Sequence, residues 1–219
     1  MDDLITSIRF DLEKAGVQGI SHYTKKLRDN SNSDVFQHLL FEGRAALMFV
    51  EVGFHVILQE APDLALKFNG EQIYAEVKHF KLKEQDKVDD KKMSEPGDLL
   101  VPYGDTVQSE GKPAWQQVYD EAKKKAKKYK EHAPYILVIE SSSPNCIEES
   151  DIKTAVDMID DDVSSSRCRE LGKLNGILLV SLNSYSLRHM RNAYFYPTNK
   201  PDVSLTLVLI SLLNKIRSG

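Results

Sequence analysis

Residues 62–80 read PDLALKFNGEQIYAEVKHF, and this stretch decides the fold that the sequence predicts. Asn69-Gly70 lies at its centre, between two segments in which apolar and polar residues alternate. Asn-Gly in this setting is a strong signal for a two-residue β-hairpin turn, because both residues tolerate the positive φ angles of a type I′ turn. We therefore predict a tight hairpin, in which Asp63 faces Glu76.

The alternation also sorts the hairpin side chains into two faces. One face is apolar and is expected to pack on the core; it holds Leu64, Leu66, Phe68, Ile73, Ala75 and Val77. The other face receives Asp63, Lys67, Tyr74, Glu76 and Lys78. With this register, the Cβ atoms of the two acids lie about 5 Å apart, and the last lysine lies beside the second acid.

Two opposed carboxylates repel one another unless a positive charge lies between them. Asp63 and Glu76 are therefore candidate ligands for Mg²⁺ or Mn²⁺, since hard divalent cations prefer oxygen ligands and often share their shell with substrate phosphate. The carbonyl of Val77 is a further candidate ligand. Lys78 could orient the attacking water or stabilise charge that builds up on a phosphate.

Upstream of the hairpin, residues 33–52 have the apolar spacing of one helix, and FHVILQ (54–59) is predicted to be a strand. Glu42 lies on the helix among apolar side chains that include Leu39, Ala46 and Phe49. A glutamate on so apolar a stripe needs a partner. Glu42 is therefore a candidate to support the metal.

Pro62-Asp63, twelve residues and then Glu76-Val77-Lys78 resembles the PD-(D/E)xK signature of the restriction-endonuclease-like nucleases. The resemblance implies that the acidic pair binds the metal and that the lysine assists hydrolysis of a phosphodiester, with DNA as the expected substrate. An upstream helix with a glutamate, matched here by Glu42, is also common in that family. Many such nucleases pair to cut both strands, so the resemblance also allows a homodimer.

Downstream of the hairpin, residues 81–113 are expected to form a long loop, and 114–131 a helix rich in lysine. A lysine run is usually a solvated face. The family resemblance, in which a helix after the hairpin contacts phosphate, favours a backbone contact through Gln116, Lys123, Lys124 and Lys127. The acids Asp157, Asp160, Asp161 and Asp162 are interpreted as a solvated surface.

The predicted fold class is α/β, with a central mixed sheet of four or five strands flanked by helices. The resemblance implies the core order αβββαβ. We expect one nuclease-like domain over 1–219, in which 1–32 is a helical addition, 33–141 the core with the site, and 142–219 a C-terminal strand and helices. YILVIES and GILLVSL are predicted to be strands, and NAYFYPTNKPD a loop with at most a short edge strand.

The amino-acid composition says less about the function than the hairpin does. The 219 residues carry a net charge of −4, which argues mildly against nucleic acid as a partner. The N-terminus lacks the features of a signal peptide, no apolar run is long enough to span a membrane, and the two cysteines have no metal-ligand spacing, so we expect a cytoplasmic protein. The alternative function is an inactive nuclease-like scaffold that binds nucleic acid or a protein partner. The sequence leaves the substrate structure and the endo- or exonucleolytic mode open.

Overall fold

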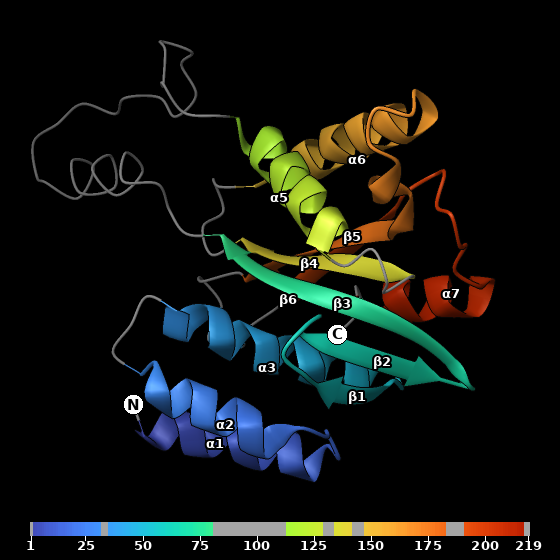
Figure 1. The fold of residues 1–219 in the computed structure, drawn as a ribbon. Coiled ribbons are helices and arrows are strands. Elements are labelled where there is room, and N and C mark those ends of the chain that lie inside the picture. The colour runs from blue at the N-terminus through green and yellow to red at the C-terminus, as the bar shows by residue number, and fades with distance from the viewer. Residues whose placement is uncertain are drawn as a thin grey trace, which may run out of the picture.

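Six strands form one mixed sheet that has helices on both faces (Figure 1). The computed structural model describes residues 2–31, 35–80, 113–128, 134–141, 147–182 and 191–216. The first half contains α1 (Asp2–Lys14), α2 (Ile20–Asp29), α3 (Val35–Glu51), β1 (His55–Leu58), β2 (Leu64–Phe68) and β3 (Glu71–Phe80). The second half contains α5 (Ala114–Lys128), β4 (Tyr135–Ser141), α6 (Glu149–Ser164), a 3₁₀ turn (Arg169–Lys173), β5 (Leu174–Leu182), β6 (Arg191–Pro197) and α7 (Leu207–Lys215). No helix within these ranges is both long and apolar enough to cross a membrane.

The strands follow one another across the sheet in chain order. β1, β2 and β3 are antiparallel, β3, β4 and β5 are parallel, and β6 returns antiparallel to β5. The α/β class and the mixed sheet are confirmed, but the expected four or five strands are six. The additional strand is β6, in a segment that was predicted to be a loop with at most a short edge strand. Its long pairing with β5, from Gly176↔Pro197 to Leu182↔Arg191, is a tertiary contact that no local pattern displays.

The predicted hairpin is confirmed in its turn and in its register. Asn69 and Gly70 both have positive φ, at 48° and 84°. Leu64 pairs with Ala75, and the same register continues to the turn, where Phe68 pairs with Glu71. The position of every polar side chain on β3 follows from this register, because a slip of one residue would turn each of them to the opposite face.

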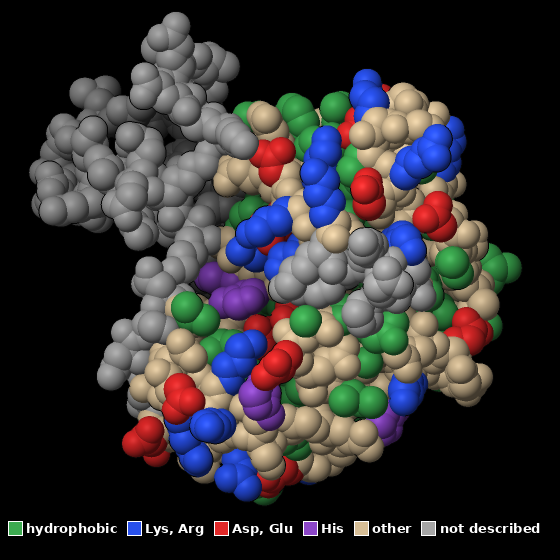
Figure 2. Space-filling view, viewed as in Figure 1, with side chains coloured by type: hydrophobic (Ala, Val, Ile, Leu, Met, Phe, Trp, Pro, Cys, Tyr) green, Lys and Arg blue, Asp and Glu red, His purple; other side chains and the backbone are tan. Residues whose placement is uncertain are grey.

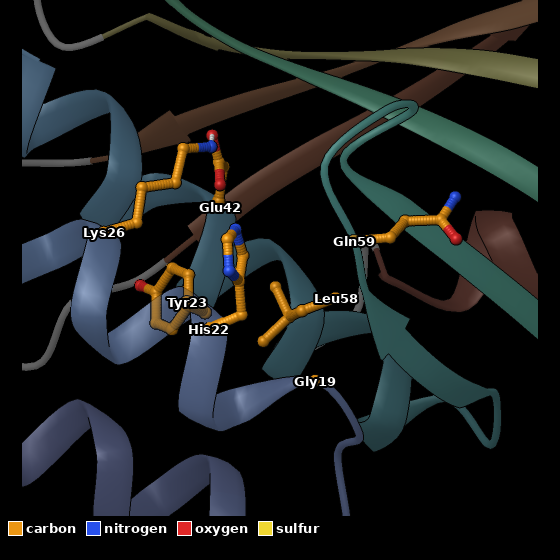
Figure 3. Close-up of a pocket in the computed structure, with 7 residues that line it drawn as sticks. All are labelled: Gly19, His22, Tyr23, Lys26, Glu42, Leu58 and Gln59. Carbon is orange, nitrogen blue, oxygen red and sulfur yellow. Dashed lines mark ion pairs between the residues drawn. The ribbon is translucent and has the colours of Figure 1, made fainter.

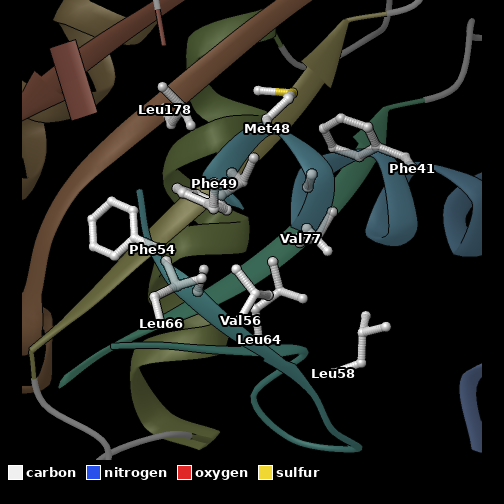
Figure 4. Close-up of a cluster of buried hydrophobic side chains, with 14 of the residues drawn as sticks. Phe41, Met48, Phe49, Phe54, Val56, Leu58, Leu64, Leu66, Val77 and Leu178 are labelled. Atoms are coloured by element: carbon white, nitrogen blue, oxygen red, sulfur yellow. The ribbon is translucent and has the colours of Figure 1, made fainter. Parts of the chain in front are cut away.

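The sheet is buried on both faces. On one face, α3 packs against β1, β2 and β3 through Phe49, Phe54 and Leu66 (Figure 4), and α1 and α2 lie outside α3 (Figure 1). On the other face, α5 and α6 cover β4 and β5 in a second cluster that contains Val118 and Ile139. On the polar face expected for the hairpin, the acids Asp63 and Glu76 are therefore buried, whereas Lys67 is exposed.

The interpretation of the α6 acids as a solvated surface is correct for Asp157 and Asp161, which are exposed, and wrong for Asp160 and Asp162. Asp162 is 3% exposed and accepts hydrogen bonds from Tyr119 and Arg167. Asp160 is 9% exposed and accepts from the backbone N–H and side-chain amide of Asn199. These carboxylates join α6 to α5 and to the segment after β6. The expected loop 81–113 lies outside the described residues except for its last residue.

Candidate metal centre

The site begins where β3 extends past the end of β2. Pairing between the two strands ends at Leu64↔Ala75, whereas β3 continues to Phe80 beside β4. The β2-side edge of β3 would then present unpaired N–H groups, which are costly to bury. Two side chains satisfy them: Val77 N–H donates to Asp63 Oδ2 at 2.8 Å, and His79 N–H donates to His38 Nδ1 at 3.3 Å.

The same edge directs a carbonyl toward the acids. In an extended strand, the N–H and C=O of one residue point to the same side. Because the N–H of Val77 points to Asp63, its C=O faces the same space. The carbonyl of Val77 is therefore expected on the side of β3 where Asp63 lies.

Three side chains from α3 and the start of β2 converge beside this edge. Ligand atoms of His38, Glu42 and Asp63 all lie within 4.8 Å of one another. Glu42 and Asp63 are buried, at 3% and 6% exposure. The structure therefore brings Glu42 to Asp63, as the apolar stripe of the helix suggested.

Burial and mutual repulsion destabilise the ionised form of both carboxyls. Burial, reinforced by Glu76, raises the pKa of Asp63 to about 7, although the N–H of Val77 acts in the opposite direction. Burial, reinforced by Asp63, raises the pKa of Glu42 to about 8, and Lys26 acts in the opposite direction. The two groups are poised to take up a proton or a cation near neutral pH.

His38 lies beside Glu42, one helical turn away on α3. Burial, together with Lys78 and Lys26, lowers the pKa of His38 to about 4, so the ring is neutral near pH 7. Its Nδ1 accepts from the backbone, which places the single ring proton on Nε2. Nε2 lies 3.5 Å from Glu42 Oε1. In this tautomer, the Nε2 proton of His38 lies on the side of the ring that faces Glu42.

On the other side of β3, α5 supplies a second group of charges. Lys125 Nζ contacts Glu76 Oε1 and lies 3.7 Å from Glu121 Oε1. Lys78 Nζ is 3.9 Å from the same Glu121 oxygen. Glu76 itself is 2% exposed. Although burial disfavours the charged form of Lys125, its pairing with Glu76 raises the pKa of the lysine.

One carboxylate oxygen of Glu76 is left without a hydrogen bond in the part of the chain that the structure describes. Among the described residues, its Oε2 is buried and has no hydrogen-bond partner. Buried carboxylate oxygens rarely lack a partner in folded proteins, and an ion is one of the accepted explanations. Glu76 is not among the residues whose ligand atoms lie within 4.8 Å of one another, which are His38, Glu42 and Asp63.

The phosphate-binding residues expected on α5 do not approach these acids as a group. Lys123 contacts Tyr119 at 3.1 Å and Asp162 at 3.4 Å, and so joins α5 to α6. The Lys124 side chain is 73% exposed and reaches Glu121 only at 4.0 Å. Lys127 is exposed and Gln116 is half-buried. The lysine of α5 that reaches the candidate centre is Lys125.

Sequence reasoning missed three residues of this centre. His38 precedes Glu42 by one helical turn. The i, i+4 spacing places both residues on the same face of the helix, so this neighbour of Glu42 could have been predicted. Lys125 lies next to the buried positions Ala122 and Ala126, and this spacing indicated a half-buried lysine that needs an acidic partner. Lys26 belongs to α2 and reaches Glu42 at 3.6 Å, a tertiary contact without any local signal.

Comparisons of the chain with protein-family models, with characterised proteins and with solved structures found no match.

Proposed function

We propose that this protein is a metal-dependent nuclease of the PD-(D/E)xK type that hydrolyses phosphodiester bonds of nucleic acid, with DNA as the expected substrate. The observation that carries the proposal is the convergence of buried Asp63 and Glu42 beside β3, where Glu76 and Lys78 follow in sequence. The order helix, three strands, helix, strand from α3 to β4 supports the same type of nuclease.

Asp63, Glu76 and Glu42 would hold the ion through carboxylate oxygens, with the carbonyl of Val77 as a further ligand. A bound Mg²⁺ or Mn²⁺ would lower the pKa of a coordinated water and polarise the scissile phosphate. His38, whose Nε2 lies 3.5 Å from Glu42 Oε1, would help to orient that carboxylate.

Lys78 is placed to serve the attacking water or the phosphate. Its side chain is 35% exposed and reaches Glu121 only at 3.9 Å, so the ammonium is free to turn toward a substrate. Lys125 is more deeply placed, at 14% exposure, and balances the charge of Glu76. The exposed side chains of Lys124 and Lys127, with Gln116, are proposed to contact the nucleic-acid backbone; Lys and Arg side chains gather over α5 in Figure 2.

One observation favours the rival function, a nuclease-like scaffold that binds nucleic acid or protein without cutting. Lys26 and Lys125 already pair with Glu42 and Glu76, so two of the three acids have internal counter-charges. In a scaffold that does not catalyse a reaction, these lysine partners would be enough to stabilise the buried acids without a bound cation. The two functions therefore differ in whether the acids respond to a divalent cation.

Thermal unfolding with and without metal separates them. We expect millimolar Mg²⁺ or Mn²⁺ to raise the unfolding midpoint of the wild-type protein by about 5 °C over EDTA, since a ligand at 100 times its Kd stabilises by about 2.7 kcal/mol. Glu76→Gln should lose this shift. Glu71→Gln, at the exposed start of the same strand, should keep it. Absence of a shift in the wild-type protein would favour the scaffold.

A further inference from the structure

Glu121 of α5 is an acid beside the candidate metal centre that the proposed metal site does not use. It lies three positions after Val118 and four before Lys125, so it belongs to the stripe of α5 that faces the sheet. Its side chain is 13% exposed. Among the described residues, its Oε1 atom is buried and accepts no hydrogen bond. A carboxylate in such a position requires positive charge nearby.

Two lysine ammonium groups approach this one oxygen atom. Lys78 Nζ lies 3.9 Å from Glu121 Oε1, and Lys125 Nζ lies 3.7 Å from it. Both distances are too long for hydrogen bonds but short enough for electrostatic attraction. Glu121 therefore attracts the ammonium of Lys78 without occupying its N–H groups, which are the groups that a water molecule or a phosphate oxygen would contact.

The other lysines around the centre are each paired with a candidate metal ligand. Lys26 of α2 points to Glu42 (Figure 3), and its Nζ lies 3.6 Å from Glu42 Oε1. Lys125 contacts Glu76 Oε1. Lys78 differs, because the acid that it pairs with is not a candidate ligand. A cation at the centre would therefore compete with Lys26 and Lys125 for their partners, but not with Lys78.

We propose that Glu121 is a positioning residue for Lys78 in phosphodiester hydrolysis. The proposal rests on the proposed nuclease function, because it takes Lys78 as the lysine that serves the water or the phosphate. A lysine side chain has many rotamers, and its ammonium must be held near the reacting atoms to act efficiently. The negative charge of Glu121 holds the ammonium on the α5 side of β3. It also keeps the ammonium from pairing with Glu76, two positions away on the same face of the strand.

Cleavage rates test the proposal in four proteins: wild type, Lys78→Ala, Glu121→Gln and the double variant. The substrate is whichever of single-stranded, duplex or branched DNA the wild-type protein cleaves fastest, at saturating Mn²⁺. Glu121→Gln should lower kcat by about 10- to 100-fold, as expected for a displaced catalytic group, and leave KM unchanged. In the Lys78→Ala protein, the same substitution should change kcat less than about twofold, because the group that it positions is absent.

A conservative variant and a matched control separate charge from folding. Glu121→Asp keeps the charge and should lose less activity than Glu121→Gln. The control is Glu13→Gln on α1, which removes an acid from an exposed pair with Arg9 and should change neither kcat nor KM. Glu121→Gln should also retain the Mn²⁺-dependent rise in unfolding midpoint that is expected of the wild-type protein, because Glu121 is not a metal ligand.

Equal factors of loss from Glu121→Gln in the wild-type and Lys78→Ala proteins would overturn the proposal, since Glu121 would then act independently of Lys78. An unchanged kcat would also overturn it, as would loss of the Mn²⁺-dependent rise. If the wild-type protein cleaves DNA and one of these results is obtained, the positioning role alone is wrong. If the wild-type protein neither cleaves DNA nor responds to Mn²⁺, the nuclease function is wrong, and the positioning role is wrong with it.

Discussion

Asp63→Asn is expected to abolish metal-dependent cleavage and, at the same time, to stabilise the metal-free protein near neutral pH. The cleavage rate should fall by a factor on the order of 10³ or more. The amide is a poorer ligand than the carboxylate, and it lacks the negative charge that balances the charge of the cation. The gain in stability follows from removing one of several buried acids that repel each other. Asparagine can still accept the hydrogen bond from Val77 N–H, so the edge of β3 keeps its cap.

The sign of the pH dependence follows from the raised pKa. Burial and Glu76 raise the pKa of Asp63 from 3.8 to about 7. The folded protein then holds a proton that the unfolded chain has lost, so this contribution to stability is fully present below about pH 4 and disappears as the pH rises through about 7. The Asp63→Asn variant has no carboxyl at this position, so its stability does not decrease in this way as the pH rises.

The difference in free energy of unfolding, Asp63→Asn minus wild type, both in EDTA, should therefore increase from pH 5 to pH 8. We expect an increase on the order of 2 kcal/mol, from about 1.4 kcal/mol per pKa unit. Denaturant titrations at several pH values measure it. Asp11→Asn, an exposed position on α1, serves as the control and should show a flat difference. A flat difference for Asp63→Asn as well would contradict the described environment of that carboxyl.

Lys125→Met is expected to produce the largest loss of stability among these variants, about 3–5 kcal/mol in EDTA, because removing one partner of a buried ion pair leaves an uncompensated charge. Lys125 is 14% exposed and contacts Glu76, whose side chain is 3% exposed. Methionine preserves much of the length and apolar volume of the lysine stem. The change therefore removes chiefly the charge and its hydrogen bonds.

Millimolar Mg²⁺ should recover a large part of the loss, since an ion held by Glu76 supplies the missing positive charge. Denaturant titrations without and with metal measure the loss of unfolding free energy and the part of it that Mg²⁺ restores. Lys124→Met is the matched control: that side chain is 73% exposed, and its removal should cost well under 1 kcal/mol. Equal losses for the two variants would show that Lys125 does not neutralise a buried acid.

The hairpin was predictable because its determinants are local. Asn69-Gly70 sets the turn, and the alternation of apolar residues sets the register from Leu64↔Ala75 to Phe68↔Glu71. The predicted pair of Asp63 with Glu76 lies beyond the paired residues, and Asp63 instead accepts a hydrogen bond from the N–H of Val77. Glu42 was predictable in the same way, because a glutamate on an apolar helical stripe must meet a partner. Both predictions depend on residues close together in the chain.

The remainder of the centre depends on contacts between distant segments. Lys125 meets Glu76 across 49 positions of sequence, and Lys26 meets Glu42 only because α2 packs on α3. β6 becomes a strand through its pairing with β5, and Asp162 is buried because Tyr119 of α5 lies over it. The α6 acids were interpreted as a solvated surface, but Asp162 is buried and lies 3.4 Å from Lys123 of α5.

Cleavage of DNA by matched proteins tests the central claim most directly. Single-stranded, duplex and branched DNA would be incubated with Mn²⁺ and the wild-type protein, Lys78→Ala, or Lys67→Ala as a control on the exposed part of β2. We predict cleavage of at least one substrate by the wild-type and Lys67→Ala proteins, and a rate at least about 100-fold lower for Lys78→Ala. Equal cleavage by all three proteins, or no cleavage by any of them, would contradict the claim that Asp63, Glu76 and Lys78 form a nuclease site.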